Sequence, residues 1–413
     1  MELTSGAFLA LITAALVLLT ATVLTVWNRI PGPRAVRYGG RLGLLVLNQA
    51  VAVLVALVWL NNTYAFYESW DDLLGTNGNQ VALGPDGGSP AVGASALGRG
   101  LPGGARPVLS FRPFKRQVME ATAVGPHSRL RGELYVWLPP QYQEAAYRTK
   151  AFPVIELLPG QPGSPRTWFG PMDVDRTLSG LIAAQRVHPF ILVSATMNYT
   201  GTKDSGCVDV PHGPRVDTWL TKDVPWLVEH SLRAAPDARH WALMGYSAGA
   251  YCSVDLTVKH PGVFHAAVSL SGYNAPESPF VVRSPALRAA NSPVLRLRRM
   301  AVQPDIALLL AGSLQDGRTV ADARTLLAEL SRPAHGTTLT VAHGGHNTAV
   351  WAAMLPTALE WLSRNTPGPV PERGGVGAVP PRHRSVPGRV VHAAPAPGRL
   401  SATPSAASVV ARG

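Results

Sequence analysis

The residues best suited to chemistry in this sequence surround Ser247, in the segment Gly245–Gly249, which reads Gly-Tyr-Ser-Ala-Gly. An apolar run of strand length precedes the segment, and residues 248–260 can follow it as a helix. Such a turn strains the serine backbone and is tolerated only if the residues two positions away are small. It exposes the hydroxyl as a nucleophile and directs the amide of Ala248 toward an oxyanion. An ordinary strand–turn–helix junction is the alternative explanation of this pattern.

A serine hydroxyl is a poor nucleophile unless a base takes its proton and an acid orients that base. When the serine lies at a strand–helix turn of this kind, the acid and then the base follow it on loops after later strands. Asp316 and His346 occupy such loops in that order. We therefore expect Ser247 as nucleophile, Asp316 as acid and His346 as base. His343 remains a rival base, and Asp322 a rival acid.

The second donor to an oxyanion is expected from the loop after the third strand of the sheet. That loop lies within Leu157–Gly163. Pro159 and Pro162 have no N–H to donate, and Gly160 permits a sharp turn. The backbone N–H of Gln161 is therefore the expected donor, although a plain strand-end turn would have the same sequence.

Elements of strand and helix length alternate through residues 108–365, which predicts an α/β domain with a mainly parallel sheet flanked by helices. Strands are expected at 117–124, 132–138, 152–158 and 190–195, directly before Ser247, and at 264–270, 305–311 and 337–342. Helices are expected at 174–185, 217–232 (with Asp217 as N-cap), 248–260, 320–330 and 348–364. Residues 274–304 contain no clear strand and are expected as a cap insertion over the site.

The net charge of +12 is concentrated in two segments rather than spread over the predicted domain. Residues 28–41 hold four arginines and no acid, and residues 366–413 hold six arginines and one glutamate. These segments account for +9, so the remainder carries only +3. A compact basic stripe with interleaved aromatic residues is not visible, which disfavours nucleic-acid binding.

The N-terminal residues 1–62 contain two apolar runs, Ala7–Trp27 and Leu44–Leu60. The first is uncharged and long enough to cross a bilayer, and the second is at the short end of that range. The arginines between them favour a cytoplasmic loop, which places the rest of the chain outside the cytoplasm. A cleaved signal peptide fits poorly because the start lacks basic residues and the run is too long. Two buried core helices are the remaining alternative.

Two further segments have the composition of linkers. Residues 63–107, rich in Gly, Pro, Ala and Ser over most of their length, are expected as a flexible extracytoplasmic tether. Residues 366–413 are rich in Pro, Ala, Gly and Arg and have few large apolar residues. We expect that tail to be disordered, because it cannot bury enough surface to offset the entropy of ordering.

The sequence contains two cysteines, Cys207 and Cys252. Both are expected near the carboxyl edge of the sheet, and outside the cytoplasm a pair of cysteines usually forms a disulfide. A bridge is therefore favoured over two separate thiols. No Cys/His spacing indicates a zinc site, and neither a dinucleotide-binding glycine motif nor a P-loop occurs. We expect chemistry that uses neither a metal nor a cofactor.

Four features together resemble the putative-esterase family of α/β-hydrolases, which includes S-formylglutathione hydrolase and the antigen 85 mycolyltransferases. They are Leu157–Gln161, Gly245–Gly249, Asp316, and Gly345–His346 before a helix with aromatic residues. The resemblance spans about 108–364, and the overall pattern looks like membrane-anchored actinobacterial members. It implies an α/β-hydrolase fold and an acyl-serine intermediate. Antigen 85 enzymes typically carry a glutamate where Asp316 stands, which argues against a prediction that this protein transfers mycolyl groups.

The expected function is that of a membrane-anchored extracytoplasmic serine esterase, with an ester or acyl-lipid as substrate. Five arginines against one glutamate in 274–304 suggest that this substrate is anionic. An acyltransferase that passes the acyl group to an alcohol is the alternative within the same chemistry. A non-catalytic hydrolase-like binding module is the alternative of another class. The sequence makes no prediction about oligomeric state.

Overall fold

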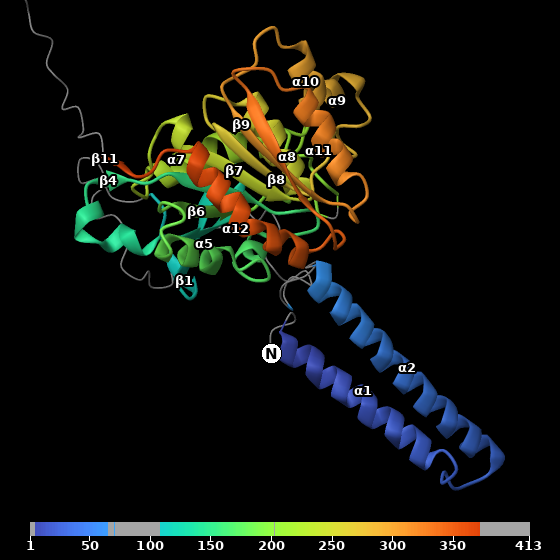
Figure 1. The fold of residues 1–413 in the computed structure, drawn as a ribbon. Coiled ribbons are helices and arrows are strands. Elements are labelled where there is room, and N and C mark those ends of the chain that lie inside the picture. Colours follow the sequence, from blue (N-terminus) through green and yellow to red (C-terminus); the bar gives the residue numbers. More distant parts are fainter. Residues whose placement is uncertain (1–4, 65–69, 71–107, 202, 372–413) are drawn as a thin grey trace, which may run out of the picture. The chain divides into compact units, whose positions relative to one another are not determined.

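The computed structural model describes residues 5–64, 70, 108–201 and 203–371. These residues form a pair of long helices near the N-terminus and an α/β domain, which we describe separately (Figure 1). The tether expected at 63–107 lies almost entirely outside the described residues, and so do residues 372–413 of the expected tail.

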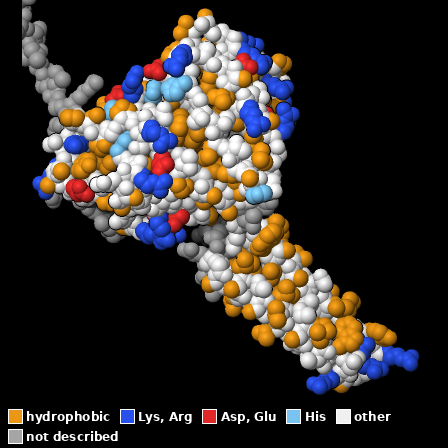
Figure 2. All heavy atoms as spheres, viewed as in Figure 1, with side chains coloured by type: hydrophobic (Ala, Val, Ile, Leu, Met, Phe, Trp, Pro, Cys, Tyr) orange, Lys and Arg blue, Asp and Glu red, His pale blue; other side chains and the backbone are white. Residues whose placement is uncertain are grey.

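The two N-terminal helices, α1 (Gly6–Val26) and α2 (Arg34–Tyr64), pack against each other as a hairpin. The hydroxyl of Thr20 donates a hydrogen bond to the side-chain oxygen of Asn48, 3.0 Å away. Both helices are long and apolar enough to cross a membrane, and few of their side chains are buried. Figure 2 shows hydrophobic side chains along the hairpin, with Lys and Arg gathered at its turn.

The second helix is longer than the apolar run that predicts it. It begins at Arg34, directly after Pro33, whereas the run begins at Leu44. Three of the four arginines expected in a loop therefore lie on the first turns of α2. The physical reason is that arginine is a good helix former and that proline favours the start of a helix.

The α/β domain is built on one nine-stranded sheet in the order β1-β2-β3-β6-β5-β7-β8-β9-β10. The six strands from β6 to β10 in that order are parallel, and the first three are antiparallel to their neighbours. The mainly parallel sheet is therefore as predicted. The strands are β1 (Arg112–Lys115), β2 (Val118–Val124), β3 (Arg131–Trp137), β5 (Val154–Leu158), β6 (Ile191–Ala195), β7 (Trp241–Tyr246), β8 (Ala266–Leu270), β9 (Ala307–Ser313) and β10 (His335–Val341).

A second, two-stranded sheet extends the domain beyond its predicted end. In this sheet β4 (Lys150–Ala151) pairs antiparallel with β11 (Val370–Pro371). Thr366 is buried, and its carbonyl accepts a hydrogen bond from a ring nitrogen of His188. The boundary expected at 365 is therefore too early, because residues 366–371 fold against the domain.

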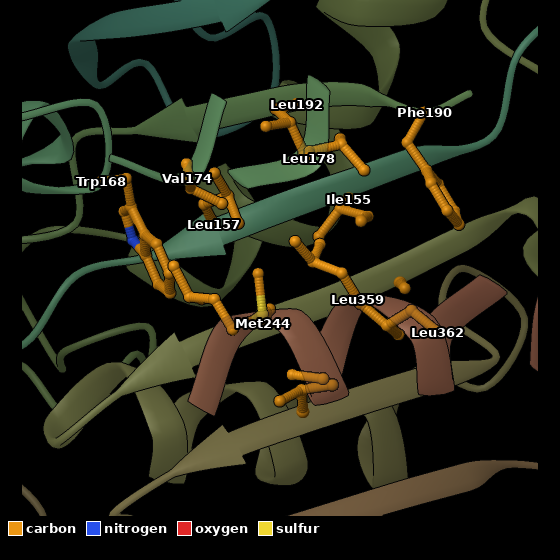
Figure 3. Close-up of a cluster of buried hydrophobic side chains, with 14 of the residues drawn as sticks. Ile155, Leu157, Trp168, Val174, Leu178, Phe190, Leu192, Met244, Leu359 and Leu362 are labelled. Carbon is orange, nitrogen blue, oxygen red and sulfur yellow. The ribbon is translucent and has the colours of Figure 1, made fainter. Parts of the chain in front are cut away.

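One face of the sheet is covered by α5 (Val174–Ala183) and α12 (Thr348–Asn365). Alternate residues of a strand point to opposite faces, and Ile155 and Leu157 of β5 point to this one. Figure 3 shows them with Met244 of β7 and with Leu359 and Leu362 of α12. This apolar layer supports the central strands from which the site loops emerge.

The opposite face is covered by α7 (Val224–Glu229), α8 (Ala248–Lys259), α10 (Pro293–Arg299) and α11 (Thr319–Ala328). The helix expected at 217–232 is interrupted. After the short α6 (Val216–Thr218) the chain widens into a π turn at Trp219–Asp223 before α7. Pro225 lacks the N–H that a regular helix would use there. Asp217 is not an N-cap: its carboxylate forms an ion pair with Lys259 at 2.6 Å and lies 2.8 Å from Nε2 of His260.

The segment 274–304, expected as a cap, divides into two parts. Val294 and Leu297 of α10 pack with Val254 of α8, so this part belongs to the helical layer that covers the sheet. Before it lies α9 (Pro285–Ala290). The part around Phe280 and Val281 packs on valines of the loop that follows β6.

Glu156, at the centre of β5, is completely buried. Neither carboxyl oxygen has a hydrogen-bond partner among the described residues. Burial raises the pKa of Glu156 well above its ordinary value, because a charged carboxylate is unfavourable away from water.

Candidate active site

Ser247 lies between β7 and α8 in the strained turn that the sequence predicts. Its backbone angles are φ 55° and ψ −122°, a region that side-chain-bearing residues rarely occupy. Its amide donates to the carbonyl of Leu270 at 3.0 Å, which anchors the turn to β8. A Cβ on Gly245 would overlap the carbonyl of Gly249, and one on Gly249 would overlap the carbonyl of Leu158. Both glycines are thus sterically required.

A chain of hydrogen bonds links Ser247, His346 and Asp316. Nε2 of His346 lies 2.8 Å from Oγ of Ser247, and Nδ1 lies 3.0 Å from each carboxyl oxygen of Asp316. The Asp316 side chain is 8% exposed and that of His346 is 42% exposed. Burial raises the pKa of Asp316, but the hydrogen bond of His346, the nearby Ser271 hydroxyl and the charge of His346 together outweigh it, so the pKa is lower than usual. Asp316 can therefore hold His346 as an ionised acceptor.

The rival residues lie elsewhere. The His343 ring is 3.5 Å from the side-chain nitrogen of Gln315, on the exposed side of the loop. Asp322 lies on the first turn of α11, 3.8 Å from a guanidinium nitrogen of Arg318. The structure thus brings together His346 and Asp316, and neither rival contacts Ser247 through a described hydrogen bond.

The acid loop also supports the histidine loop. The side-chain oxygen of Gln315 accepts a hydrogen bond from the amide of Gly344 at 2.8 Å. The hydroxyl of Ser313 donates to the carbonyl of Gly344. Gly344 has φ 100°, a conformation that favours glycine. The turn before His346 is therefore fixed by side chains whose role the sequence does not reveal.

Aromatic rings form one wall of the site. Trp351 of α12 meets the His346 ring edge-on, with centroids 4.9 Å apart, and stacks on Tyr246 at 4.7 Å. Trp168 also contacts the Tyr246 ring, with centroids 5.2 Å apart. Trp351 therefore packs against the His346 ring, while the hydrogen bond to Asp316 fixes the rotation of that ring.

The loop with the expected second oxyanion donor borders the serine. A Cβ on Gly160 would lie 2.8 Å from the ring of Tyr246 and 3.2 Å from Cβ of Ser247, so this residue must be small to approach so closely. The next amide in the loop is that of Gln161, and Ala248 begins α8, where N–H groups and the helix dipole favour negative charge. These two amides remain our predicted oxyanion donors.

Cys207 and Cys252 form a disulfide that closes a separation of 45 residues. Both are fully buried. The bond joins the loop after β6 to α8, five residues beyond Ser247. Within the described residues, no group of three or more His, Cys, Asp or Glu side chains is arranged to hold a metal ion.

Comparison with known proteins shows what the α/β domain is similar to. A family model described as "Putative esterase" matches residues 131–362. An uncharacterized protein of Corynebacterium glutamicum is 26% identical over 247 residues, which cover 56% of this chain and 57% of that protein. The alignment thus spans little more than half of this relative.

Solved esterase structures share the fold of the domain. A ferulic acid esterase has a TM-score of 0.51 at 21% identity, over 61% of this chain and 99% of that one. S-formylglutathione hydrolase from Agrobacterium tumefaciens has a TM-score of 0.52 at 13% identity, over 62% and 99%. FphF, a fluorophosphonate-binding serine hydrolase of Staphylococcus aureus, has a TM-score of 0.50 at 16% identity, over 60% and 98%. At these identities the likeness concerns the fold.

Proposed function

Because the chain belongs to the putative-esterase family of hydrolases, we propose that it is a serine carboxylic-ester hydrolase, anchored in a membrane and active outside the cytoplasm. The observation that carries the chemistry is the hydrogen-bonded series Ser247–His346–Asp316 at a strained strand–helix turn. A binding module would have no need of a serine hydroxyl 2.8 Å from a histidine that a buried carboxylate orients.

The reaction follows from these contacts. Oγ of Ser247 attacks the ester carbonyl while Nε2 of His346 takes its proton, and Asp316 stabilises the resulting imidazolium. The Gln161 and Ala248 amides bind the oxyanion. His346 then protonates the leaving alkoxide, which leaves an acyl-serine. Water attacks the acyl-serine while His346 takes its proton, and His346 returns that proton to Oγ of Ser247 as the bond to the acyl group breaks and the acid departs.

Fluorophosphonate labelling tests this assignment. The wild-type protein should be labelled, and Ser247→Ala should not. On a short p-nitrophenyl ester, Ser247→Ala and His346→Ala should each lower kcat by several powers of ten, since loss of a triad serine or histidine costs on the order of 10⁶ in a serine protease. His343→Ala is the matched control. Full activity in His346→Ala, with loss in His343→Ala, would contradict the choice of base.

We propose hydrolysis rather than acyl transfer because the His346 side chain is 42% exposed. A transferase has to keep water away from the base that activates its acceptor alcohol. Incubation with an acyl donor, with and without glycerol or trehalose, should give free acid in excess of new ester by mass spectrometry. An excess of new ester at millimolar acceptor would favour transfer.

The location is proposed from the hairpin and the cysteines. Both helices present apolar side chains outward, and the arginines at their turn favour the cytoplasmic side. The disulfide suits an oxidising compartment. A single cysteine at Gly75, in a protein without its two native cysteines, should react with a membrane-impermeant reagent in intact cells. Reaction only after permeabilisation would place the domain inside.

The substrate is proposed to be an ester or acyl-lipid with negative charge. Within 274–304, Arg283, Arg288 and Arg299 are exposed, whereas Arg298 is paired with Glu329. Clustered positive charge raises the local concentration of anions.

A further inference from the structure

Asn198, three residues beyond β6, makes contacts that neither the sequence pattern nor the catalytic series explains. Its side-chain nitrogen donates two hydrogen bonds to the loop after β5, to the carbonyl of Gly160 at 3.0 Å and to that of Gly163 at 2.5 Å. Only an amide nitrogen can donate to both carbonyls, so the orientation of this side chain is determined. Its oxygen is buried and has no hydrogen-bond partner among the described residues.

The first of these bonds bears directly on the oxyanion donor. The carbonyl of Gly160 and the N–H of Gln161 belong to one planar peptide unit and point in opposite directions when it is trans. A bond that fixes this carbonyl therefore also aims the Gln161 N–H, away from Asn198. Since Gly160 lies against Ser247, the orientation of this peptide decides whether the N–H can reach an oxyanion on the serine adduct.

Other contacts make the support for this peptide rigid. The side-chain nitrogen of Gln161 donates to the carbonyl of Gly201 at 3.1 Å. The loop after β5 and the loop after β6 therefore each donate side-chain hydrogen bonds to backbone carbonyls of the other. The same loop carries Cys207, whose disulfide ties it to α8. The N-terminus of α8 supplies the other expected donor. Hydrogen bonds and the disulfide thus connect the loop that carries Gln161, through the loop after β6, to the helix that begins at Ala248.

We propose that Asn198 is a positioning residue of the oxyanion hole, which acts by holding the Gly160–Gln161 peptide in the orientation that binds the transition state. The inference rests on the proposed function of Ser247. Under this proposal Asn198 affects how tightly the enzyme binds the transition state and has little effect on how tightly it binds the ester. The reason is that a misdirected N–H of Gln161 costs most when the carbonyl oxygen of the substrate carries negative charge.

Two variants separate this role from simple packing. Asn198→Ala removes both donors, and Asn198→Asp keeps the shape but turns an acceptor toward two carbonyls. We expect kcat to fall about 10-fold to 100-fold in Asn198→Ala, somewhat less than the loss of an oxyanion donor itself, and further in Asn198→Asp. KM should change by less than about 3-fold. Asn365→Ala is the matched control, because Asn365 also donates to a backbone carbonyl, that of Trp361, at the far end of α12.

The decisive readout is the affinity for an aryl boronic acid, whose tetrahedral serine adduct carries an oxygen in the oxyanion position. Its Ki should rise in proportion to the loss of kcat/KM in the Asn198 variants and stay unchanged in the control. Each protein is compared at equal folded concentration, measured by near-UV circular dichroism. If Asn198→Asp does not fold, Asn198→Ser replaces it. With one hydroxyl donor for two carbonyls, it should fall between wild type and Asn198→Ala.

Unchanged kcat and boronate affinity in the folded Asn198 variants, with a wild type that fluorophosphonate labels, would overturn this inference alone. A fall in kcat without any rise in the boronate Ki would overturn it as well, since the oxyanion hole would then be intact. A wild type that is neither labelled nor active would overturn the proposed function and this inference with it.

Discussion

The disulfide between Cys207 and Cys252 should contribute more to stability than any other single contact around the site. It closes a separation of 45 residues. In the chain-entropy description, cross-linking a loop of this length lowers the entropy of the unfolded chain by an amount equivalent to about 4 kcal/mol at 25 °C. Replacing both cysteines by alanine should therefore lower the free energy of unfolding by about that amount. With an m-value of about 3 kcal/mol/M, the urea midpoint should fall by about 1 M.

A double-mutant cycle distinguishes the bridge from the packing of its sulfur atoms. Either Cys207→Ala or Cys252→Ala alone already abolishes the cross-link, so the double variant should lose only slightly more than each single one. If the loss came from packing instead, the two single losses would add. The assay is urea unfolding of the full chain in detergent, followed by tryptophan fluorescence, with no reductant present. Additive losses, or a loss under about 1 kcal/mol in the double variant, would refute the entropic reasoning.

Three other perturbations test separate parts of the structure. Glu156→Gln should stabilise the protein at neutral pH. In the wild type the raised pKa means that the folded state keeps a proton which the unfolded chain releases, so stability falls as pH rises above the ordinary glutamate pKa. The gain should shrink toward pH 4 in urea unfolding measured across pH. Gly249→Ala should abolish esterase activity and fluorophosphonate labelling, because its Cβ would overlap the carbonyl of Leu158. Replacing Arg283, Arg288 and Arg299 by glutamine should lower kcat/KM for an anionic ester several-fold at low salt and leave a neutral ester unaffected, with the difference lost at high salt.

Each of these has an outcome that would contradict it. A Glu156→Gln protein whose advantage does not depend on pH would mean that the carboxyl is not the source of the effect. Normal labelling of Gly249→Ala would mean that the turn can relax around a methyl group. Equal salt dependence for both esters, in wild type and variant, would remove the steering argument for the arginines.

Much of the site can be predicted from the sequence because local geometry demands it. The turn at Ser247 requires small residues on both sides, and a buried parallel strand appears as an apolar run, so Asp316 and His346 can be located by the strands they follow. Only the tertiary contacts show that His346 and Asp316, and not the alternatives His343 and Asp322, are hydrogen-bonded in series with Ser247. The family resemblance is confirmed over 131–362.

The features that the sequence does not predict depend on partners far along the chain. Asn198 meets Gly160 across 38 residues, and its type and surroundings in the sequence give no sign of that contact. The short strand β11 pairs with β4 at the other end of the domain, and two residues are too few to show a pattern. The break in the helix expected at 217–232 could have been anticipated from Pro225, which is incompatible with a regular helix interior.

The positions of the three site residues along the chain also set when the protein becomes reactive during its synthesis. His346 lies 99 residues after Ser247, and the chain is made and folds from its N-terminus. Until His346 has emerged and β10 has joined the sheet, the serine hydroxyl has no base, although Asp316 has already been synthesised. An unfinished chain is therefore harmless to any ester it meets, including the lipids of the membrane in which we propose it is anchored. Reactivity arises in one late step, when β10 and α12 complete the domain around the large sheet.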